Sequence, residues 1–428
     1  MRYLLIFLIL NTASGLFAQD DYYNESAIKY DDYVYSENIK SVELHLKNVK
    51  FSLPMMRLGS DEKLRLSFDD LDLGNETYYY TFILCNKDWT PADLMPMEYI
   101  EGLTEDYFNS TYGSFNTTIR YTHYETILPS ESIKLTKAGN YLLKIYHQDD
   151  PEHPIITRRV YVYDPKVIVE AKVTAAKEAP DRDYKQELSV KINTNQYPMP
   201  DIYSDLTVKI QQNGRKDNMK TLGNPKIVTA NYIWFNTIGD IVFEGGNEFR
   251  KLDIRSFKTP SAHVSKIRYD SSGYQIYLLP DHFRTYKKYL QYQDIDGEFA
   301  IINWDDPHLS AKIESDYAFV HFTLPVSEPI DSGEIFLIGA FTNWRMDRFS
   351  RLQYNADERA YATTLILKQG YYDYNYIFLQ NGKTKGDMGF VEGDHRETEN
   401  VYYIFVYYRD QGELYDHLLA IERFSSEP

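Results

Sequence analysis

Apolar and polar residues alternate along most of the chain, and this pattern predicts β-strands. Successive side chains of a strand point to opposite faces, so a period of two places one apolar face against a core. In the first part of the chain the pattern occurs at 42–46, 64–68, 141–146 and 159–163. Residues 78–85, Tyr-Tyr-Tyr-Thr-Phe-Ile-Leu-Cys, are more continuously apolar and predict a central strand. Short strands separated by Gly, Pro, Asn and Asp turn signals are typical of a β-sandwich.

The alternation resumes after Asp164-Pro165, which we interpret as a domain boundary, and Pro325, Pro329 and Gly333 indicate a second linker. No helical pattern longer than about three turns is visible. We therefore predict an all-β protein with three tandem immunoglobulin-like β-sandwich domains in a row. Their expected ranges are 19–164, 165–326 and 327–428. The strands expected after the first boundary are 167–169, 188–192, 206–210, 231–235, 241–243, 274–278 and 319–324.

The first 18 residues have the composition of a secretory signal peptide. Arg2 precedes a short run rich in Leu, Ile and Phe, and Ala18 is a small residue at the expected cleavage site before Gln19. The run is shorter than the ~20 apolar residues that a membrane-spanning helix needs. We expect an exported protein that does not insert into the membrane.

Composition argues against several partner classes. The chain of 428 residues has a net charge of −17, so repulsion opposes binding to nucleic acid or to anionic lipid. The single cysteine, Cys85, cannot form an internal disulfide and is expected to be a small buried apolar residue. The 40 tyrosines suit many-stranded sheets or an adhesive surface.

No motif for catalysis or metal binding is evident. The ten histidines are scattered, and neither a nucleophile elbow nor a phosphate-binding loop occurs. The segment 294–298 lacks the later ligands of a calcium loop and is expected to be an acidic turn. Adjacent Asp305 and Asp306 do not suit a glycosidase pair, whose carboxyl groups must face one bond. We expect no enzyme activity, no cofactor and no metal.

Two irregular stretches carry a resemblance to a known family. One is Asp240–Lys258, in which Gly245-Gly246 indicates a turn with positive φ, and the other is the aromatic insertion 86–127, with its segments Cys85–Trp89, Glu98–Gly102 and Ser110–Tyr124. Both resemble the type IX secretion system plug proteins of Bacteroidetes. The resemblance implies a non-enzymatic periplasmic protein. It would bind the periplasmic opening of the large outer-membrane β-barrel translocon and seal it.

Such a plug needs an adhesive surface, and aromatic and arginine side chains contribute most to interface energies. The alternative is that half or more of the candidates pack within their own long loops. The candidate partner-binding residues are Tyr99, Tyr107, Phe108, Tyr112, Phe115, Tyr121, Phe249, Arg250 and Arg255.

The stretch 334–383 resembles the early-set, immunoglobulin-like modules attached to glucan-acting enzymes. In glucan-binding members an aromatic residue, a lysine and a second Trp contact sugar. Trp344 matches the first position, but Asn375 stands near the lysine position and Lys383-Thr384 where the second Trp would be. Glucan binding is therefore disfavoured, and Trp344 is expected to pack in a core. A glucan-binding or glucan-processing exported protein is still the alternative function, and a surface adhesin is a third.

Overall fold

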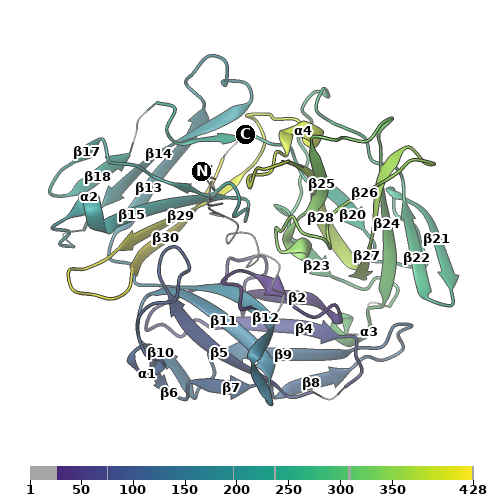
Figure 1. Cartoon of the computed structure of the whole chain (residues 1–428), viewed down its shortest axis with the longest axis horizontal. Helices are drawn as coiled ribbons and strands as arrows, with labels where there is room; N and C mark the ends of the chain where they lie inside the picture. The colour runs from purple at the N-terminus through teal and green to yellow at the C-terminus, as the bar shows by residue number, and fades with distance from the viewer. Residues whose placement is uncertain (1–26, 75, 196, 236–237, 307–309, 427–428) are drawn as a thin grey trace, which may run out of the picture.

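In the computed structural model the chain is almost entirely β, as predicted. The structure describes residues 27–74, 76–195, 197–235, 238–306 and 310–426, so the expected signal peptide at 1–18 lies outside the described residues. Helices in this part of the chain are single turns: α1 (Pro96–Tyr99), α2 (Ile202–Asp205), α3 (Ala311–Glu314), α4 (Gly389–Glu392) and the 3₁₀ turn η1 (Ala340–Thr342). Mainly antiparallel sheets, with parallel pairs only at β3–β12 and β22–β24 among the described strands, form three sandwich units around a common centre (Figure 1).

The first unit, residues 33–163, packs two main sheets over one core. One sheet has the order β1-β12-β11-β5-β7, with β3 beside β12, and the facing sheet has the order β2-β4-β9-β8. The side chains between them include Leu66, Phe68, Tyr80 and Leu143, all fully buried. The strands are β1 (Tyr33–Val34), β2 (Ile39–Leu46), β3 (Met55–Arg57), β4 (Leu64–Asp70), β5 (Tyr78–Cys85), β7 (Glu105–Tyr107), β8 (Ser110–Gly113), β9 (Thr122–Leu128), β11 (Gly139–His147) and β12 (Asp150–Tyr163), with a separate pair of β6 (Ile100–Gly102) and β10 (Ile133–Leu135).

The second unit contains residues 168–244 together with 401–425. Its sheets have the orders β13-β14-β18-β17, with β19 beside β14, and β16-β15-β29-β30. Val190, Ile192, Ile210 and Ile404 lie in its core. The strands are β13 (Ile168–Ala175), β14 (Lys185–Asn193), β15 (Leu206–Gln212), β16 (Lys220–Thr221), β17 (Ile227–Val228), β18 (Tyr232–Phe235), β19 (Val242–Glu244), β29 (Val401–Tyr408) and β30 (His417–Ser425).

The third unit, residues 250–392, is inserted into the second. Its sheets have the orders β20-β28-β23, with β25 also paired to β28, and β21-β22-β24-β27-β26. Its core includes Leu252, Val320, Leu337 and Tyr374. The strands are β20 (Arg250–Asp253), β21 (Val264–Asp270), β22 (Gly273–Leu278), β23 (Phe299–Ile301), β24 (Tyr317–Pro325), β25 (Gly333–Ile338), β26 (Gln353–Asn355), β27 (Ala360–Lys368) and β28 (Gly370–Gln380).

This strand pairing corrects the expected ranges 165–326 and 327–428. The expected boundary after residue 326 separates β24 from β27, although these strands pair along nine residues from Tyr317↔Lys368 to Pro325↔Ala360. The second unit is instead completed by β29, which pairs with β15 from Leu206↔Tyr408 to Gln212↔Tyr402. The units are therefore not strictly in a row, because the strands that complete the second unit come after the third unit in the sequence.

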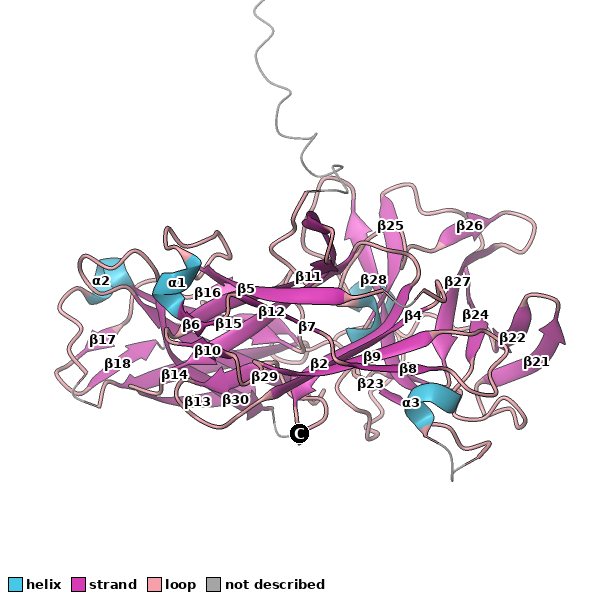
Figure 2. Cartoon of the chain, turned by 90° about the horizontal axis from the view of Figure 1, so that it is seen from below, coloured by secondary structure: helices cyan, strands magenta, loops and turns pink. Residues whose placement is uncertain are grey.

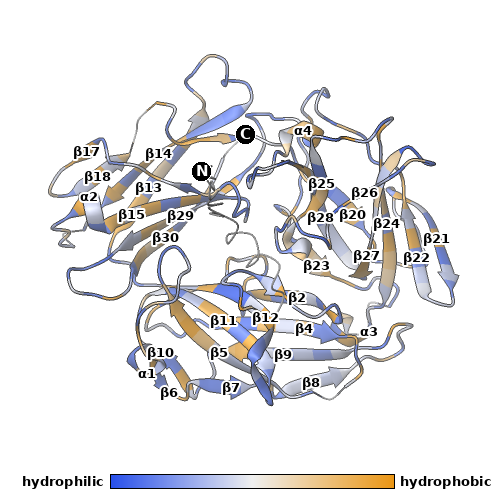
Figure 3. Ribbon diagram, viewed as in Figure 1, coloured by the Kyte–Doolittle hydropathy of each residue, from blue (hydrophilic) through white to orange (hydrophobic). Residues whose placement is uncertain are grey.

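Strand β29 joins the first and second units through a shared apolar layer. Tyr402, Ile404 and Val406 point into the core of the second unit, whereas Tyr403 and Phe405 pack against the outer face of the first. The same layer contains Cys85, which is buried as expected, and burial raises the pKa of its thiol to about 12. Strand β5 of the adjoining sheet is itself rich in apolar residues (Figure 3). Both faces of β29 thus lie against apolar side chains.

The third unit meets the first through polar side chains. Lys368 and Asp69 form a buried ion pair across this joint, and the Asp316 carboxylate accepts hydrogen bonds from the backbone N–H groups of Thr118 and Ile119 at 2.7 and 3.1 Å. Figure 1 looks down the shortest axis of the molecule and shows the three units spread across the view, and Figure 2 shows the same body from the edge.

Candidate partner-binding surfaces

The aromatic insertion at 86–127 is an ordered part of the first unit. It contains α1, β6, β7, β8 and the core strand β9, which pairs with β4 along seven residues from Leu64↔Leu128 to Asp70↔Thr122. The aromatic content of this stretch is therefore explained mainly by sheet formation. Its side chains divide into a buried and an exposed set.

Three of the candidate residues in the insertion are buried and offer no surface to a partner. Tyr99 and Phe108 belong to the core of the first unit. The ring of Tyr121 packs edge-on against Tyr317 of the third unit, and its hydroxyl donates to the Ser315 carbonyl at 2.9 Å. Neighbouring groups of the same chain cover these three side chains, so a contact role for them stays a prediction that requires them to be uncovered first.

Tyr107, Tyr112 and Phe115 are the exposed candidates, with exposed fractions of 51%, 47% and 64%. Tyr107 ends β7 and Tyr112 lies on β8, and each of these strands is the last of its sheet. Phe115 follows β8, and its backbone N–H donates to the Ile313 carbonyl at 2.9 Å, which ties this turn to α3 of the third unit. The exposed rings therefore stand on backbone that other elements hold in place, so little ordering is needed on binding.

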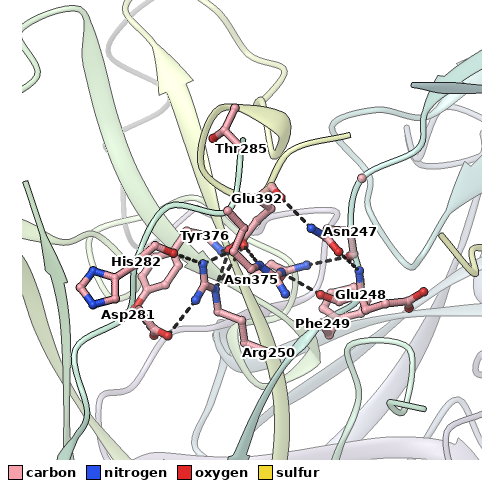
Figure 4. A network of polar contacts seen from close by, with 12 residues as sticks. Asn247, Glu248, Phe249, Arg250, Asp281, His282, Thr285, Asn375, Tyr376 and Glu392 are labelled. Carbon is pink, nitrogen blue, oxygen red and sulfur yellow. Dashed lines mark hydrogen bonds and ion pairs between the residues drawn. The ribbon is translucent and has the colours of Figure 1, made fainter. Parts of the chain in front are cut away.

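Arg250 lies inside an ion-pair network within the third unit and its crossover, shown in Figure 4. Its guanidinium contacts Asp281 at 2.8 Å and Glu392 at 2.9 Å, and it donates to the His282 carbonyl at 2.7 Å. Arg284 also pairs with Glu392, at 2.6 Å. Burial alone would raise the pKa of Glu392, but the two guanidinium groups hold it below its usual value. Arg250 is therefore held by groups of the fold itself, and its side chain is only 10% exposed.

The other two residues of that segment differ in exposure. Phe249 is buried, with its ring edge-on to Trp344 at 5.8 Å between centroids. Arg255 pairs with Asp253 and stacks its guanidinium on Trp304, 3.3 Å from the ring centroid. Trp304 is itself exposed and was not among the expected contacts. It follows Arg255 by 49 positions in the chain, so their stacking depends on the fold alone.

The turn at 245–246 has two different glycine requirements. Gly246 has a φ of +67°, as expected for this turn. Gly245 instead approaches other backbone closely, because a Cβ there would lie 2.1 Å from the His395 carbonyl oxygen.

Trp344 is partly buried and packed between units. A Cβ on Gly214 of the second unit would lie 2.6 Å from the indole nitrogen, and one on Gly297 would lie 2.3 Å from its six-membered ring. The ring also borders a cavity of about 640 Å³ where the three units meet. Asn375, near the position of the absent lysine, is fully buried and accepts a hydrogen bond from Arg284 at 3.0 Å. The three positions of a sugar platform are therefore not presented together on an open face.

The carboxylates considered as chemical candidates have structural partners. Asp305 accepts hydrogen bonds from the Phe257 N–H at 2.8 Å and from the Gln369 amide at 2.9 Å. Asp294 accepts from the N–H groups of Phe249 and Asp296 at 2.7 and 3.0 Å. Among the described residues no group of three or more His, Cys, Asp or Glu side chains could hold a metal ion.

Comparison with known proteins decides the family. A family model described as "Type 9 secretion system plug protein 1st domain" matches residues 39–164, the range that forms the first unit. A crystal structure of a hypothetical protein from Parabacteroides merdae ATCC 43184 is similar over 93% of this chain and 100% of its own, with 32% identity and a TM-score of 0.90. This chain belongs to the type IX secretion system plug protein family. A role in type IX secretion follows from that membership.

The remaining comparisons add little to the plug family assignment. A putative membrane anchored protein from Corynebacterium diphtheriae has 7% identity and a TM-score of 0.13, which supports no structural argument. No curated protein matches the chain. In the part of this plug family member that the structure describes, no helix is both long and apolar enough to cross a membrane.

Proposed function

We propose that this protein is a non-enzymatic periplasmic plug that binds the periplasmic opening of the outer-membrane translocon of the type IX secretion system and seals it. Membership of the plug family is the observation that carries this proposal. The partner is a large β-barrel, and the protein associates with the outer membrane through it.

The geometry supports a role as a seal. A body that covers an opening must be broad and must not deform, because a partly unfolded or flexible plug leaves gaps. The three units spread around a common centre (Figure 1), and the first two share a buried apolar layer through Phe405 and Tyr161. The third is joined to the first by the fully buried pair of Lys368 and Asp69.

The exposed candidates of the first unit supply the contact surface in this proposal. Tyr107, Tyr112 and Phe115 present aromatic rings at the edges of β7 and β8. Arg255 and Trp304 add a stacked pair on the third unit. Aromatic and arginine anchors of this kind contribute about 2 kcal/mol or more each where they become fully desolvated in an interface.

The first experiment is co-purification from outer membranes with an affinity tag on the plug. We expect a complex with a very large β-barrel. In cells that lack the plug, a dye or antibiotic that the outer membrane normally keeps out should enter the periplasm. A tagged protein that never brings down such a barrel under mild detergent extraction contradicts the proposal.

A variant series then locates the contact. The combined substitutions Tyr107→Ala, Tyr112→Ala and Phe115→Ala should reduce recovery of the barrel at least about tenfold, because several anchors are lost together. Tyr203→Ala is the matched control, since Tyr203 is 66% exposed but lies on the second unit. Equal recovery of the barrel with both variants would mean that the contact lies elsewhere on the protein. The plug function itself is tested separately, by the first co-purification.

A further inference from the structure

The third unit is attached to the rest of the molecule differently from the first two. Among the described residues, each cluster of apolar core side chains in the third unit contains only residues of that unit. The first and second units, in contrast, share the layer around Tyr161 and Phe405. Across the joint of the first and third units, the ring contact of Tyr121 with Tyr317 is surrounded by ion pairs and hydrogen bonds.

The chain passes between the second and third units twice, at 245–249 and 393–400, and the two crossings touch. The His395 N–H donates to the Gly246 carbonyl at 2.9 Å, and the Thr398 hydroxyl donates to the same oxygen at 2.9 Å. Two adjacent crossings form a natural hinge, because a few backbone positions there can absorb a rotation of the whole inserted unit.

Away from the crossings in the sequence, an N-terminal segment contacts all three units through one carboxylate. Asp31 lies 3.4 Å from the Arg159 guanidinium of the first unit, 2.5 Å from the Lys216 ammonium of the second and 2.9 Å from the Arg345 guanidinium of the third. Lys216 also pairs with Asp32 at 2.5 Å. Burial raises the pKa of Asp31, but the three cations outweigh it and hold the pKa below its usual value.

The same segment is fixed to the first unit by backbone contacts. Tyr33 and Val34 form β1 and pair with Thr157 and Ile156 of β12. The Tyr30 carbonyl accepts from Arg159 at 2.8 Å. The Arg345 guanidinium additionally stacks over the Tyr33 ring, 4.7 Å from its centroid. The segment is therefore anchored on one unit, and its side chains reach the other two.

We infer that residues 28–35 act as a latch that keeps the third unit closed against the first two, and that loss of the Asp31 contacts lets the third unit swing about the crossings at 245–249 and 393–400. This inference does not depend on the proposed function. Other ion pairs also connect the first and third units: Asp69 with Lys368, which is buried, and Glu125 with Lys312 and Glu37 with Arg348, which are more exposed. Asp31 differs from these because its single carboxylate, 27% exposed, contacts cations of all three units.

Distances between spin labels test the latch in the purified protein. A first pair, Ser60→Cys with Glu358→Cys, spans the first and third units, and a second pair, Ser60→Cys with Asn224→Cys, spans the first and second. All three sites are exposed, whereas native Cys85 is buried and excluded from labelling. The latch variant is Asp31→Asn. The control is Asp253→Asn, whose carboxylate is 28% exposed and pairs with Arg255 inside one unit.

We expect a narrow distribution for both pairs in the parent protein. Asp31→Asn should lengthen and broaden only the first-to-third distance and should speed amide exchange at the crossings about tenfold, since hydrogen bonds to charged groups are lost. Asp253→Asn should change neither distance. An unchanged first-to-third distance in Asp31→Asn, or equal broadening of both pairs, overturns the latch. Arg345→Gln tests the same contact from the other side if Asp31→Asn does not fold, and an unchanged distance there has the same meaning.

Discussion

The Lys368 ammonium lies 2.6 Å from an Asp69 carboxylate oxygen, across the joint between the first and third units, and both side chains are 1% exposed. The Tyr317 hydroxyl donates to the same carboxylate at 2.6 Å, and the His123 ring contacts its other oxygen at 2.6 Å. Burial lowers the pKa of Lys368, while Asp69 opposes that shift. The joint therefore contains a compact, buried network in which Asp69 contacts each of the other side chains.

Removing one member of this pair should be costly. Lys368→Met leaves the Asp69 charge buried without its main partner, and such a loss typically destabilises a protein by about 3–5 kcal/mol. We expect a shift of the urea unfolding midpoint to lower concentration. The double variant Lys368→Met with Asp69→Asn should recover part of the loss, because no unpaired charge is left. Equal stability of Lys368→Met and the parent protein contradicts this role.

His123 should make the stability of this joint depend on pH. Burial lowers the pKa of His123, but hydrogen bonds to Asp69 and Glu125 outweigh burial and raise it above 6.5. A raised folded pKa means that the contribution to stability is complete below pH 6.5 and is lost as the pH rises through the folded value.

The measurement is urea unfolding of the parent protein and of His123→Gln across pH 5 to 9. The difference between them should be largest at the acid end and should shrink with increasing pH. Asp69 has a lowered pKa, so its own contribution would be lost only in more acidic solution. A difference that grows with pH would show that the neutral imidazole is the stabilising form.

Substitutions at the first crossing should distinguish the energetic cost of close packing from the cost of a strained backbone conformation. Gly245→Ala places a Cβ 2.1 Å from the His395 carbonyl oxygen, so the two crossings must move apart, and we expect a loss of about 3 kcal/mol. Gly246→Ala meets no atom within 4 Å but keeps a positive φ, and it should cost about 1 kcal/mol.

The reference for these two variants is Gly223→Ala, which has open space and no positive φ. It should change the free energy of unfolding by less than about 0.5 kcal/mol. If Gly245→Ala behaves like Gly223→Ala in thermal or urea unfolding, the close approach of the crossings is not maintained in solution.

Two changes test the role of β29: Phe405→Ala tests the apolar layer that this strand shares with the first unit, and a truncation tests whether the strand completes the second unit. Phe405 is buried between β29 and the first unit, so Phe405→Ala should cost about 3–5 kcal/mol. The control is Leu414→Ala, in the exposed turn between β29 and β30, which should be nearly neutral. A chain ending before residue 399 should lose the protected amides of β15 in hydrogen exchange, because β29 is its partner. Retained protection of β15 contradicts this topology.

Strands with one buried face could be predicted from the sequence. Residues 206–210 alternate apolar and polar, and they lie in β15 with Val208 and Ile210 buried. Residues 78–85 form β5 with the expected bounds. In both cases the pattern follows directly from one face against a core, which is a local property of the chain.

β29 was not anticipated, although it is the strand that connects two units. Its eight residues, Val-Tyr-Tyr-Ile-Phe-Val-Tyr-Tyr, are buried on both faces, so no alternation marks it. Its pairing with β15 joins residues about 190 positions apart, as in Gln212↔Tyr402. A continuously apolar run such as 401–408 suits a strand or another kind of buried segment, so it does not indicate that β15 is its pairing partner.

The sequence also could not show which of the candidate contact residues are exposed. Tyr112 and Tyr121 lie in one aromatic stretch and look alike in sequence, but Tyr112 is exposed at a sheet edge and Tyr121 is covered by Tyr317 and Ser315. Arg250 and Arg255 are five residues apart, and only the former is enclosed by Asp281 and Glu392. The covering groups come from distant parts of the chain.

The sequence by itself determined the all-β class, the positions of the clearly alternating strands, the burial of Cys85 and, through its irregular loops, the resemblance to the plug family. These properties rest on local periodicity and on residue types at short spacing. Only the tertiary structure decided that the third unit is inserted into the second, that Asp31 touches all three units, and which aromatic rings face solvent. The physical reason is that long-range pairing and burial are set by neighbours distant in the chain, whose contribution no local pattern records.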